Sequence, residues 1–382
     1  MKRYKLGDIC EIVSGSTPKT NVEEYWDGDV KWITPAEIND ETYIITDSVR
    51  KITELGVKKT GLSSFPEGTV ILSSRAPIGK VAIAGCEMYC NQGFKNLICS
   101  DKIDNRYLYW FLKGNTAFLH SLGRGATFKE ISKTIVSNIE INVPDKQSQR
   151  QVVDNLEKIA KVIQLRKQEL LKFDELIKAR FVEMFGDTVL NPFGWDKELL
   201  GIVCDVRDGT HDSPQYYETG LPLVTSRNVT GGKIDLTNCS LICETDFKKI
   251  NERSKVDIGD IIMPMIGTVG KPVIVDIEPN FAIKNVSLIK FRSDSRVLNN
   301  YVRALLQSDY FDDAVLSKVR GGTQKFISLG DIRKLEILVP PMKLQEQFAV
   351  FVNQVDKSKF AVQKALDEAQ LLFDSLMQQY FG

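Results

Sequence analysis

Two long segments of the sequence place apolar residues at alternating spacings of three and four positions. In the first, at about residues 146–186, these positions are Leu156, Ile159, Ile163, Leu170, Phe173, Ile177 and Met184. In the second, at about residues 343–381, they are Phe348, Val352, Val355, Val362, Leu366, Ala369, Phe373, Leu376 and Tyr380. The spacing predicts two amphipathic helices of roughly 60 Å, each with one apolar seam. Because a seam left in water is unfavourable, we expect the two helices to pack as an antiparallel coiled coil.

The regions that precede each helix contain short β-rich runs broken by glycine and proline. Such runs occur at residues 68–72, 80–84, 260–263 and 271–275, while 107–122 and 301–315 have helical patterns. The pattern predicts an α+β fold with two mixed α/β domains, dominated by antiparallel strands. The expected segments are a first domain at 1–144, a helix at 145–187, a second domain at 188–340 and a helix at 341–382.

The second half of the chain repeats the first. Residues 124–144, RGATFKEISKTIVSNIEINVP, return as 320–340, RGGTQKFISLGDIRKLEILVP, and the register continues without a gap to the Phe-Gly pairs at 185–186 and 381–382. Further upstream, these pairs match at drifting offsets: Leu6-Gly7 with Leu200-Gly201, Thr34 with Thr225, Gly79-Lys80 with Gly270-Lys271, Lys95-Asn96 with Lys284-Asn285, and Tyr107 with Tyr301. The repeat predicts a pseudo-twofold arrangement of two domains that share one scaffold. Between the matched pairs the halves differ, as in WITPAEI against LVTSRNV, so we expect two different surfaces.

Composition limits the classes of function. The 382 residues contain 50 Lys plus Arg and 50 Asp plus Glu, so a nucleic-acid site has to be a local patch rather than a global positive field. No apolar run approaches the length of about 18 residues that a membrane span needs, and the first ten residues lack the apolar core of a signal peptide, so we expect a cytoplasmic protein. Seven cysteines without a CxxC pair and only two histidines argue against zinc and against a disulfide framework.

Motifs for catalysis are missing from the sequence. It has no GxxxxGK[ST] phosphate loop, no GxGxxG that opens a helix after a strand, and no Asn- or Asp-Pro-Pro-aromatic loop of the kind that an amino-methyltransferase requires. A self-sufficient methyltransferase is therefore disfavoured, and we expect no catalytic residues and no metal site in this chain.

Binding of DNA is better supported than catalysis. Glycine-rich loops with cations occur at equivalent places in both halves, where backbone N–H groups could approach phosphates and side chains could donate further hydrogen bonds. The alternative is that these glycines only shape turns and that the cations are solvated. Chosen by loop position, repeat matching and donor chemistry, the candidate DNA-binding residues are Arg75, Lys80, Lys95, Arg124, Thr127, Lys129, His211, Arg227, Lys271, Lys284, Arg320, Thr323 and Lys325.

Several segments resemble the specificity subunit of bacterial type I restriction-modification systems. They are LGDICEIVSGSTP, WITPAEI, SSRAPIGKVAIA with NQGFKNL, ARFVEMFGD followed by NPFGW, and RGGTQKFISLGDIRKLEILVPP. The resemblance covers essentially the whole chain, and the order and spacing of the motifs make it specific.

This resemblance implies two target-recognition domains, each reading one half of a bipartite, asymmetric site on double-stranded DNA. The two helices would set the gap between the half-sites and dock two modification subunits, which are methyltransferases, and restriction subunits with translocase and nuclease activity would join the complex. S-adenosylmethionine, ATP and magnesium would belong to these partners, and this chain would hold no cofactor. Two alternatives stay open: a helical scaffold for protein partners without DNA readout, and the specificity subunit of a methyltransferase-only system.

Overall fold

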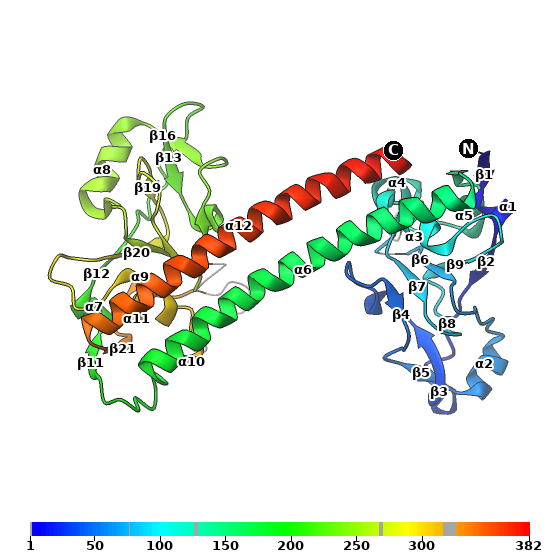
Figure 1. Ribbon diagram of the computed structural model, residues 1–382, viewed down its shortest axis with the longest axis horizontal. Coiled ribbons are helices and arrows are strands. Elements are labelled where there is room, and N and C mark those ends of the chain that lie inside the picture. The colour runs from blue at the N-terminus through cyan, green and yellow to red at the C-terminus, as the bar shows by residue number, and fades with distance from the viewer. Residues whose placement is uncertain (1, 76, 126–128, 267–269, 316–325) are drawn as a thin grey trace. The chain divides into compact units, whose positions relative to one another are not determined.

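The computed structural model describes residues 2–75, 77–125, 129–266, 270–315 and 326–382 (Figure 1). The chain divides into two compact units, of which unit 1 comprises Met1–Arg166 and Ala365–Gly382, and unit 2 comprises Lys167–Lys364. Each unit contains one mixed α/β lobe and half of each long helix. We call residues 2–143 lobe 1 and residues 196–339 lobe 2.

Lobe 1 is built from short strands and helices. Its strands are β1 (Lys2–Lys5), β2 (Cys10–Ser14), β3 (Trp26–Ile33), β4 (Ile44–Ile45), β5 (Lys51–Ile52), β6 (Val70–Ser73), β7 (Val81–Ala84), β8 (Tyr89–Cys90), β9 (Phe94–Cys99) and β10 (Glu140–Val143). Its helices are α1 (Leu6–Ile9), η1 (Glu23–Tyr25), η2 (Pro35–Glu37), α2 (Glu54–Thr60), α3 (Asn105–Gly114), α4 (Thr116–Leu122) and α5 (Lys133–Ser137). The stretch with a helical pattern at 107–122 forms two helices, because the chain turns at Asn115 between α3 and α4.

Lobe 2 repeats this order of elements. Its strands are β11 (Asp196–Leu199), β12 (Asp205–Asp208), β13 (Leu221–Val224), β14 (Val229–Thr230), β15 (Lys233–Ile234), β16 (Ser240–Ile242), β17 (Ile261–Pro264), β18 (Val273–Ile274), β19 (Ala282–Ile283), β20 (Val286–Lys290) and β21 (Glu336–Val339). Its helices are α7 (Leu200–Val203), η3 (Ser226–Asn228), α8 (Glu244–Ser254), α9 (Asn299–Leu305), α10 (Asp309–Ala314) and α11 (Leu329–Arg333).

Sheet topology confirms the predicted internal repeat. Lobe 1 has sheets in the orders β2-β9-β6-β7-β4, β5-β3-β8 and β1-β10, and lobe 2 has the matching orders β12-β20-β17-β18, β16-β13-β19 and β11-β21. Pairings are antiparallel except for β4 with β7, β3 with β8 and β13 with β19. The lobes differ at their edges, where β4 extends the main sheet of lobe 1 and the hairpin β14-β15 belongs to lobe 2.

Strand register corrects one of the matches expected between the halves. Cys90 at the end of β8 corresponds to Ile283 at the end of β19, since the residues that follow, Asn91 and Lys284, both donate a backbone hydrogen bond to the neighbouring strand, at Ile33 O and Val224 O. The loop to the next strand is one residue shorter in lobe 2, so Lys95 on β9 corresponds to Ser287 on β20, where Lys284 had been expected. The two Lys-Asn dipeptides are thus not equivalent.

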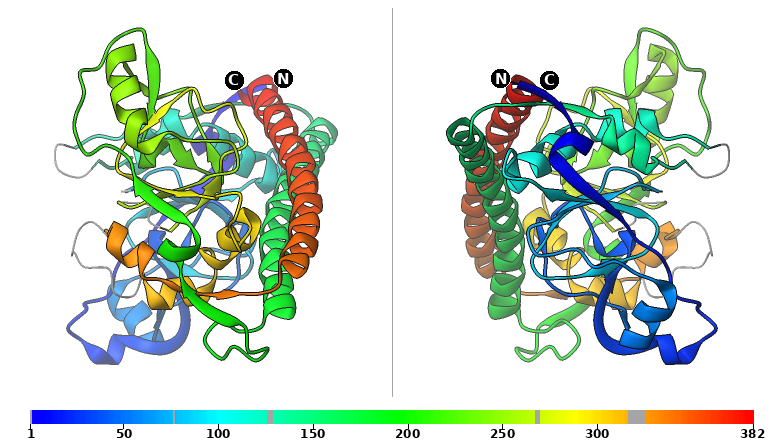
Figure 2. Two further views of the ribbon diagram at one scale, coloured as in Figure 1. Left: turned by 90° about the vertical axis from the view of Figure 1, so that its left-hand side faces the viewer. Right: turned by 90° about the vertical axis from the view of Figure 1, so that its right-hand side faces the viewer.

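The two predicted long helices are confirmed. They are α6 (Lys146–Phe185) and α12 (Met342–Phe381), each of 40 residues, and both views of Figure 2 show them side by side. In unit 1 the Asn155 side chain of α6 donates to Tyr380 Oη of α12 at 3.2 Å, and in unit 2 the ring of Phe181 on α6 lies 5.8 Å from the ring of Phe348 on α12. Within each unit the helices therefore pack along their apolar faces.

A buried glutamine joins the start of each helix to its lobe. Gln149 is fully buried, accepts a hydrogen bond from the Asp104 backbone N–H, and donates to the carbonyl oxygens of Lys102 and Pro144. Gln345 makes the same three bonds in unit 2, with the backbone of residues 298, 296 and 340. Because unpaired buried backbone groups are costly, each amide fixes the angle at which a helix leaves its lobe.

The aromatic end of each helix packs against a tyrosine of a lobe. In unit 1 the ring of Phe381, at the end of α12, lies 5.2 Å from that of Tyr107 on α3. In unit 2 the ring of Phe185, at the end of α6, lies 4.8 Å from that of Tyr301 on α9. Each lobe core is therefore completed by a helix end that comes from the other repeat.

Candidate nucleic-acid interface

Several loops of lobe 1 meet at one end of its main sheet. The described residues of these loops are 15–20 after β2, 74–75 and 77–80 between β6 and β7, 91–93 between β8 and β9, and 123–125 and 129–131 before α5. The Ser74 N–H and hydroxyl both donate to Gly93 O, at 2.7 and 3.1 Å, and the Ile131 N–H donates to Ser74 O at 2.9 Å. We call this set of loops, with the side chains on them, the strand-end surface of lobe 1.

The glycine-rich loop is closed at its base by two backbone hydrogen bonds. The Arg124 N–H donates to Glu130 O at 3.0 Å, and the Glu130 N–H donates to Arg124 O at 2.9 Å. Arg124 and Lys129 are exposed, and their side chains make no hydrogen bond or ion pair with described residues. Both cations are therefore available to a polyanion.

A carboxylate binds two of the predicted cations in lobe 1. Glu130 accepts from Arg75 Nε at 2.9 Å and from Lys95 Nζ at 3.3 Å, and Lys95 is 6% exposed whereas the side chain of Arg75 is 45% exposed. Burial opposes ionisation of Glu130, but the hydrogen bonds and charges of Arg75 and Lys95 outweigh it and lower the pKa of Glu130. Lys95 holds this cluster together from inside, and Arg75 presents its guanidinium at the surface.

Lys80 has a structural partner. Its ammonium group donates to Pro35 O at 2.9 Å, which links the loop between β6 and β7 to η2. The preceding Gly79 has a φ of 88°, a conformation that favours glycine, and Gly270 at the equivalent position of lobe 2 has a φ of 82°. The turn is thus shared by both lobes, although the side chains around it are not.

The strand-end surface of lobe 2 consists of the equivalent loops, at residues 209–220, 265–266, 270–272, 284–285 and 326–328. The Ile327 N–H donates to Met265 O at 3.0 Å, as the Ile131 N–H does to Ser74 O in lobe 1. Ile266 and Phe326 form the backbone bridge that corresponds to the one between Arg75 and Glu130. The ionic cluster of lobe 1 is therefore replaced by two apolar residues in lobe 2.

His211 lies in an ionic cluster that is specific to lobe 2. Its Nε2 is 2.8 Å from Asp208 Oδ2, and its Nδ1 is 3.0 Å from Asn285 Oδ1. The hydrogen bond with Asp208, followed by that with Asn285, raises the pKa of His211 above its ordinary value. Asp208 is 6% exposed and also accepts from Arg253 of α8.

The remaining described candidates of lobe 2 fall into two groups. Arg227, on η3, and Lys271 are exposed. Lys284 is 9% exposed, and its ammonium donates to Ser213 Oγ at 2.7 Å, which fixes the loop that carries His211. The other predicted residues, Thr127, Arg320, Thr323 and Lys325, lie outside the described residues.

Sequence reasoning missed the amide side chains on these surfaces. Gln92 follows β8 and Asn285 follows β19, at equivalent places in the two lobes, and each faces a residue on the loop that follows the first strand of the main sheet. The signal available in the sequence is the segment NQGFKNL, which contains Gln92 three residues before the predicted Lys95.

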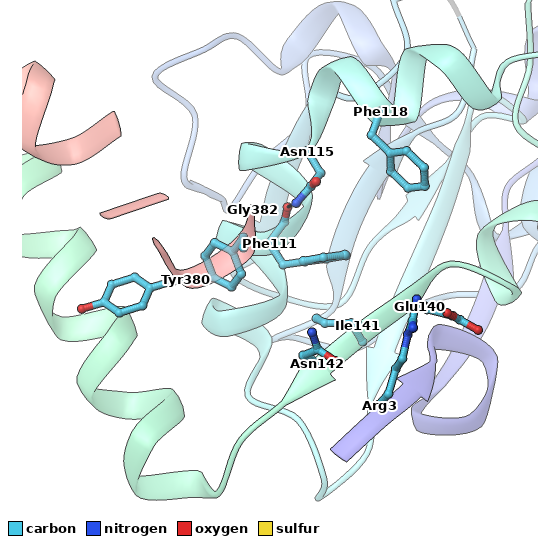
Figure 3. Close-up of a pocket in the computed structure, with 10 residues that line it drawn as sticks. Arg3, Phe111, Asn115, Phe118, Glu140, Ile141, Asn142, Tyr380 and Gly382 are labelled. Atoms are coloured by element: carbon cyan, nitrogen blue, oxygen red, sulfur yellow. Dashed lines mark hydrogen bonds and ion pairs between the residues drawn. The ribbon is translucent and has the colours of Figure 1, made fainter. Parts of the chain in front are cut away.

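A cavity of about 220 Å³ in unit 1 lies apart from the strand-end surface. Figure 3 shows Phe111 and Phe118 on one side of it, the end of α12 beside them, and Arg3 next to Glu140, with which it forms an ion pair of 2.5 Å. None of its lining residues belongs to the strand-end loops.

The described residues contain neither a helix that could span a membrane nor a cluster of metal ligands. No helix in that part of the chain is both long and apolar enough to cross a bilayer. The same residues contain no group of three or more His, Cys, Asp or Glu side chains arranged to hold a metal ion.

Two lobes with one scaffold and unlike polar surfaces, each joined to a pair of 40-residue helices, define a two-site recognition protein. The family model described as the type I restriction modification DNA specificity domain matches residues 1–172 and again residues 194–369. The chain belongs to this family and is the specificity component of a type I restriction-modification system, as the sequence motifs predicted.

Relatives and solved structures agree with this assignment. The chain is 31% identical to the type I restriction enzyme MjaIX specificity subunit of Methanocaldococcus jannaschii, over 98% of this chain and 90% of that protein. It is 21% identical to the EcoKI specificity subunit of Escherichia coli, over 82% and 73% of the two chains. The crystal structure of the type I S subunit from M. genitalium has the same fold, with a TM-score of 0.59 at 14% identity, covering 100% of this chain and 96% of that one.

Proposed function

We propose that each lobe reads one half of a bipartite, asymmetric DNA site through its strand-end surface. The observation that carries this proposal is the duplicated scaffold with unlike side chains on equivalent loops, such as Arg75 and Glu130 in lobe 1 against Ile266 and Phe326 in lobe 2. Because the two lobes share one scaffold, they hold equivalent loops in the same position. A difference in the side chains on these loops would therefore become a difference in the bases preferred.

The predicted cations divide into contact and support roles. Arg75, Arg124 and Lys129 in lobe 1, and Arg227 and Lys271 in lobe 2, are exposed and would contact phosphates or base edges. His211 is exposed as well, but both of its ring nitrogens face partners in its own lobe, so it would act on recognition through the neighbouring Asn285. Lys80, Lys95 and Lys284 are held by partners within their own lobes, and they would fix the shape of the loops. Thr127, Arg320, Thr323 and Lys325 remain predicted phosphate contacts, on the repeat argument alone.

The helices would set the gap between half-sites and dock two modification subunits. Leu176 on α6 is 46% exposed in unit 2, and Leu372, at the equivalent position of α12, is 52% exposed in unit 1. Two equivalent exposed leucines are what two copies of one partner would require. The chemistry of methylation and of DNA cleavage, with S-adenosylmethionine, ATP and magnesium, would belong to the modification and restriction subunits and not to this chain.

Assembly with the modification subunit of its own system tests the DNA proposal. Fluorescence anisotropy with random duplex should show affinity that falls steeply as salt rises, because phosphate contacts release counterions. Methylation-sensitive sequencing of the host genome should show two unlike half-sites separated by a constant gap. A complex that assembles but shows no salt-dependent binding to duplex DNA would leave the helical-scaffold alternative in its place.

A heptad insertion tests the role of the helices in spacing. Seven residues inserted after Arg166 in α6 and seven after Lys364 in α12 keep the apolar seam aligned and lengthen both helices by about 10 Å. The preferred gap should grow by about three base pairs, at roughly 3.4 Å each. An unchanged gap in methylation mapping would show that the helices do not set it.

A further inference from the structure

The amide side chains Gln92 and Asn285 occupy equivalent positions and have equivalent partners. Gln92 follows β8 and receives a hydrogen bond on Oε1 from the hydroxyl of Thr17, on the loop after β2. Asn285 follows β19 and faces the ring of His211, on the loop after β12, through Oδ1. In both lobes the carbonyl oxygen of the amide therefore points at the facing loop.

The NH₂ group of each amide is free. Neither Gln92 Nε2 nor Asn285 Nδ2 bonds to any described residue, and neither is among the buried polar atoms that lack a partner in the described part of the chain. A polar atom that is neither paired nor buried is reachable by solvent, and hence by a ligand. On its strand-end surface each lobe thus has one side-chain amide whose oxygen is fixed by a hydrogen-bond partner and whose two N–H donors are free.

The backbone supports this role for Asn285. Its φ is 56°, a left-handed conformation that asparagine tolerates better than most residues. Its own N–H donates to Thr210 O at 3.2 Å, and the neighbouring Lys284 is anchored on Ser213, so the loop is fixed on both sides of the amide.

We propose that Gln92 and Asn285 are the matched base-reading side chains of the two lobes, and that the charge state of His211 decides whether Asn285 offers a donor or an acceptor to the base. The proposal rests on the DNA-reading function proposed above and names residues within that same surface. Thr17 and His211 are positioning residues, because they act through the amides.

Geometry gives the reason for the switch. With both ring nitrogens of His211 facing oxygens, Asp208 Oδ2 and Asn285 Oδ1, only the imidazolium can donate to both. Asp208 is buried and also binds Arg253. When the ring loses one proton, the remaining proton therefore stays on Nε2, where it is donated to Asp208. Nδ1 then becomes an acceptor, which favours a turned amide that donates to it from Nδ2 and presents Oδ1 outward.

The charged groups around His211 set the direction of the pH dependence. Asp208 on β12 favours the protonated ring and Arg253 on α8 opposes it, while the nearby Lys284 is directed to Ser213. The donor state is present at low pH and is lost as the pH rises through the raised pKa of His211. Lobe 1 has no such switch, because the hydroxyl of Thr17 can donate or accept at any pH in this range.

Selection from randomised duplexes, using the full chain assembled with its modification subunits, tests the reading residues. Gln92→Ala should lose preference at one position of one half-site, and Asn285→Gly, which keeps the left-handed backbone, at one position of the other, each by roughly 5- to 150-fold. Each variant serves as a control for the half-site of the other, and Asn238→Ala, an exposed amide elsewhere in lobe 2, should leave both half-sites unchanged.

The possible failures are distinguishable. If the wild-type complex selects no bipartite motif, the DNA-reading function itself is wrong. If it selects one and both variants keep every base preference, or lose affinity equally for all sequences, the amides do not read bases and only this inference fails.

Binding at several pH values tests the positioning role of His211. Between about pH 6 and 8.5, the wild-type preference at the Asn285 position should change by about tenfold, the order of a hydrogen bond to a charged group. His211→Gln should remove this pH dependence, and Asp208→Asn should shift its midpoint to lower pH. The other half-site should show no change in any of these proteins. A profile that is the same in His211→Gln as in wild type would overturn the switch.

Discussion

Lobe 1 and lobe 2 share the strand order of their sheets except at the edges, but their ionic groups lie at different places on the strand-end surface. Lobe 1 has its cluster where the loop after β6 meets the loop before α5, with Arg75, Glu130 and Lys95. Lobe 2 has its cluster where the loop after β12 meets the loop after β19, with Asp208 and His211. At each of these places the opposite lobe has uncharged residues.

This difference separates what the fold requires from what recognition requires. The shared features, such as Gln149 with Gln345 and Tyr107 with Tyr301, are buried and bond to backbone, so they would be needed whatever DNA is read. The unshared features lie on the loops of the strand-end surface or at the strand ends beside them, as Lys95 does near the start of β9 and Asp208 at the end of β12. A change at a shared position should therefore affect stability in both lobes alike, and a change at an unshared position should affect recognition by one lobe.

The largest effect is expected at the aromatic ends of the helices. Phe185→Ala removes a fully buried ring that contacts Tyr301 and Phe348, and should lower the free energy of unfolding by about 3–5 kcal/mol. Phe381→Ala, at the matched but half-buried position, should cost about 2 kcal/mol. Urea unfolding monitored by fluorescence measures both.

Phe360→Ala is the control for this comparison, since that ring is 65% exposed on α12 and its loss should change stability by less than about 0.5 kcal/mol. Equal losses for Phe185 and Phe381 would show that the two helix ends contribute alike despite their different burial.

The second effect concerns the buried glutamines. Gln149→Ala and Gln345→Ala each leave one backbone N–H and two carbonyl groups without partners, so both should cost roughly 2–4 kcal/mol, and by similar amounts. Gln151→Ala and Gln347→Ala, exposed glutamines further along the same helices, are matched controls. If only one of the two buried substitutions lowers the free energy of unfolding, the two lobes do not bind their helices in the same way.

The aromatic helix ends and the buried glutamines also show which parts of the fold could be predicted from the sequence. The helices and the duplicated strands were predictable, because apolar periodicity and repeated anchors such as Gly79 and Gly270 depend on local sequence. Gln149 and Gln345 stand in the same register and could have been noted as a pair, but their burial could not be predicted from the polar character of glutamine, since the buried backbone groups that they pair with come from elsewhere in the fold.

The candidate site was less predictable for a physical reason. A loop that is one residue shorter after β19 than after β8 shifted the Lys-Asn dipeptides out of equivalence, and one dipeptide resembling another concealed that shift. A lysine can contact DNA or fix the shape of a loop, depending on which carboxylates and carbonyl groups of other loops lie next to it, as Glu130 lies next to Lys95. Such contacts between distant segments leave no pattern in the local sequence.

The third effect is on assembly with the modification subunits. It tests whether the two units have equal docking sites for them. Leu176→Asp and Leu372→Asp should each weaken binding of one modification subunit by about 30-fold, the order of a hot-spot residue, and the double variant should bind neither. Mass photometry of the complexes would resolve one bound copy from two. Val189→Asp, at a 64% exposed position outside the helices, should keep both copies, and a single substitution that releases both copies would rule out independent sites.

The smallest effect is expected for Glu130→Gln, which makes the ionic cluster of lobe 1 more like its uncharged counterpart in lobe 2. Loss of the carboxylate frees the exposed Arg75 from an anion that competes with phosphate, so affinity for random duplex should rise by about threefold, with a salt slope steeper by about one. Phe326→Ala, at the equivalent place of lobe 2, should leave the salt slope unchanged.

The pH dependence of stability provides a second measurement on the same variant. Because the pKa of Glu130 lies below its ordinary value of 4.5 in the folded chain, its ionised form stabilises the fold above that value, and this contribution is lost as the pH falls through the lowered pKa. The difference in stability between wild type and Glu130→Gln should therefore be constant from neutral pH down to about pH 5 and should shrink below it. Since Glu130 is partly exposed, solvent screening keeps this difference under about 1 kcal/mol. If the difference instead grows on acidification, Glu130 is protonated in the folded protein and Arg75 is free to contact DNA already in the wild type.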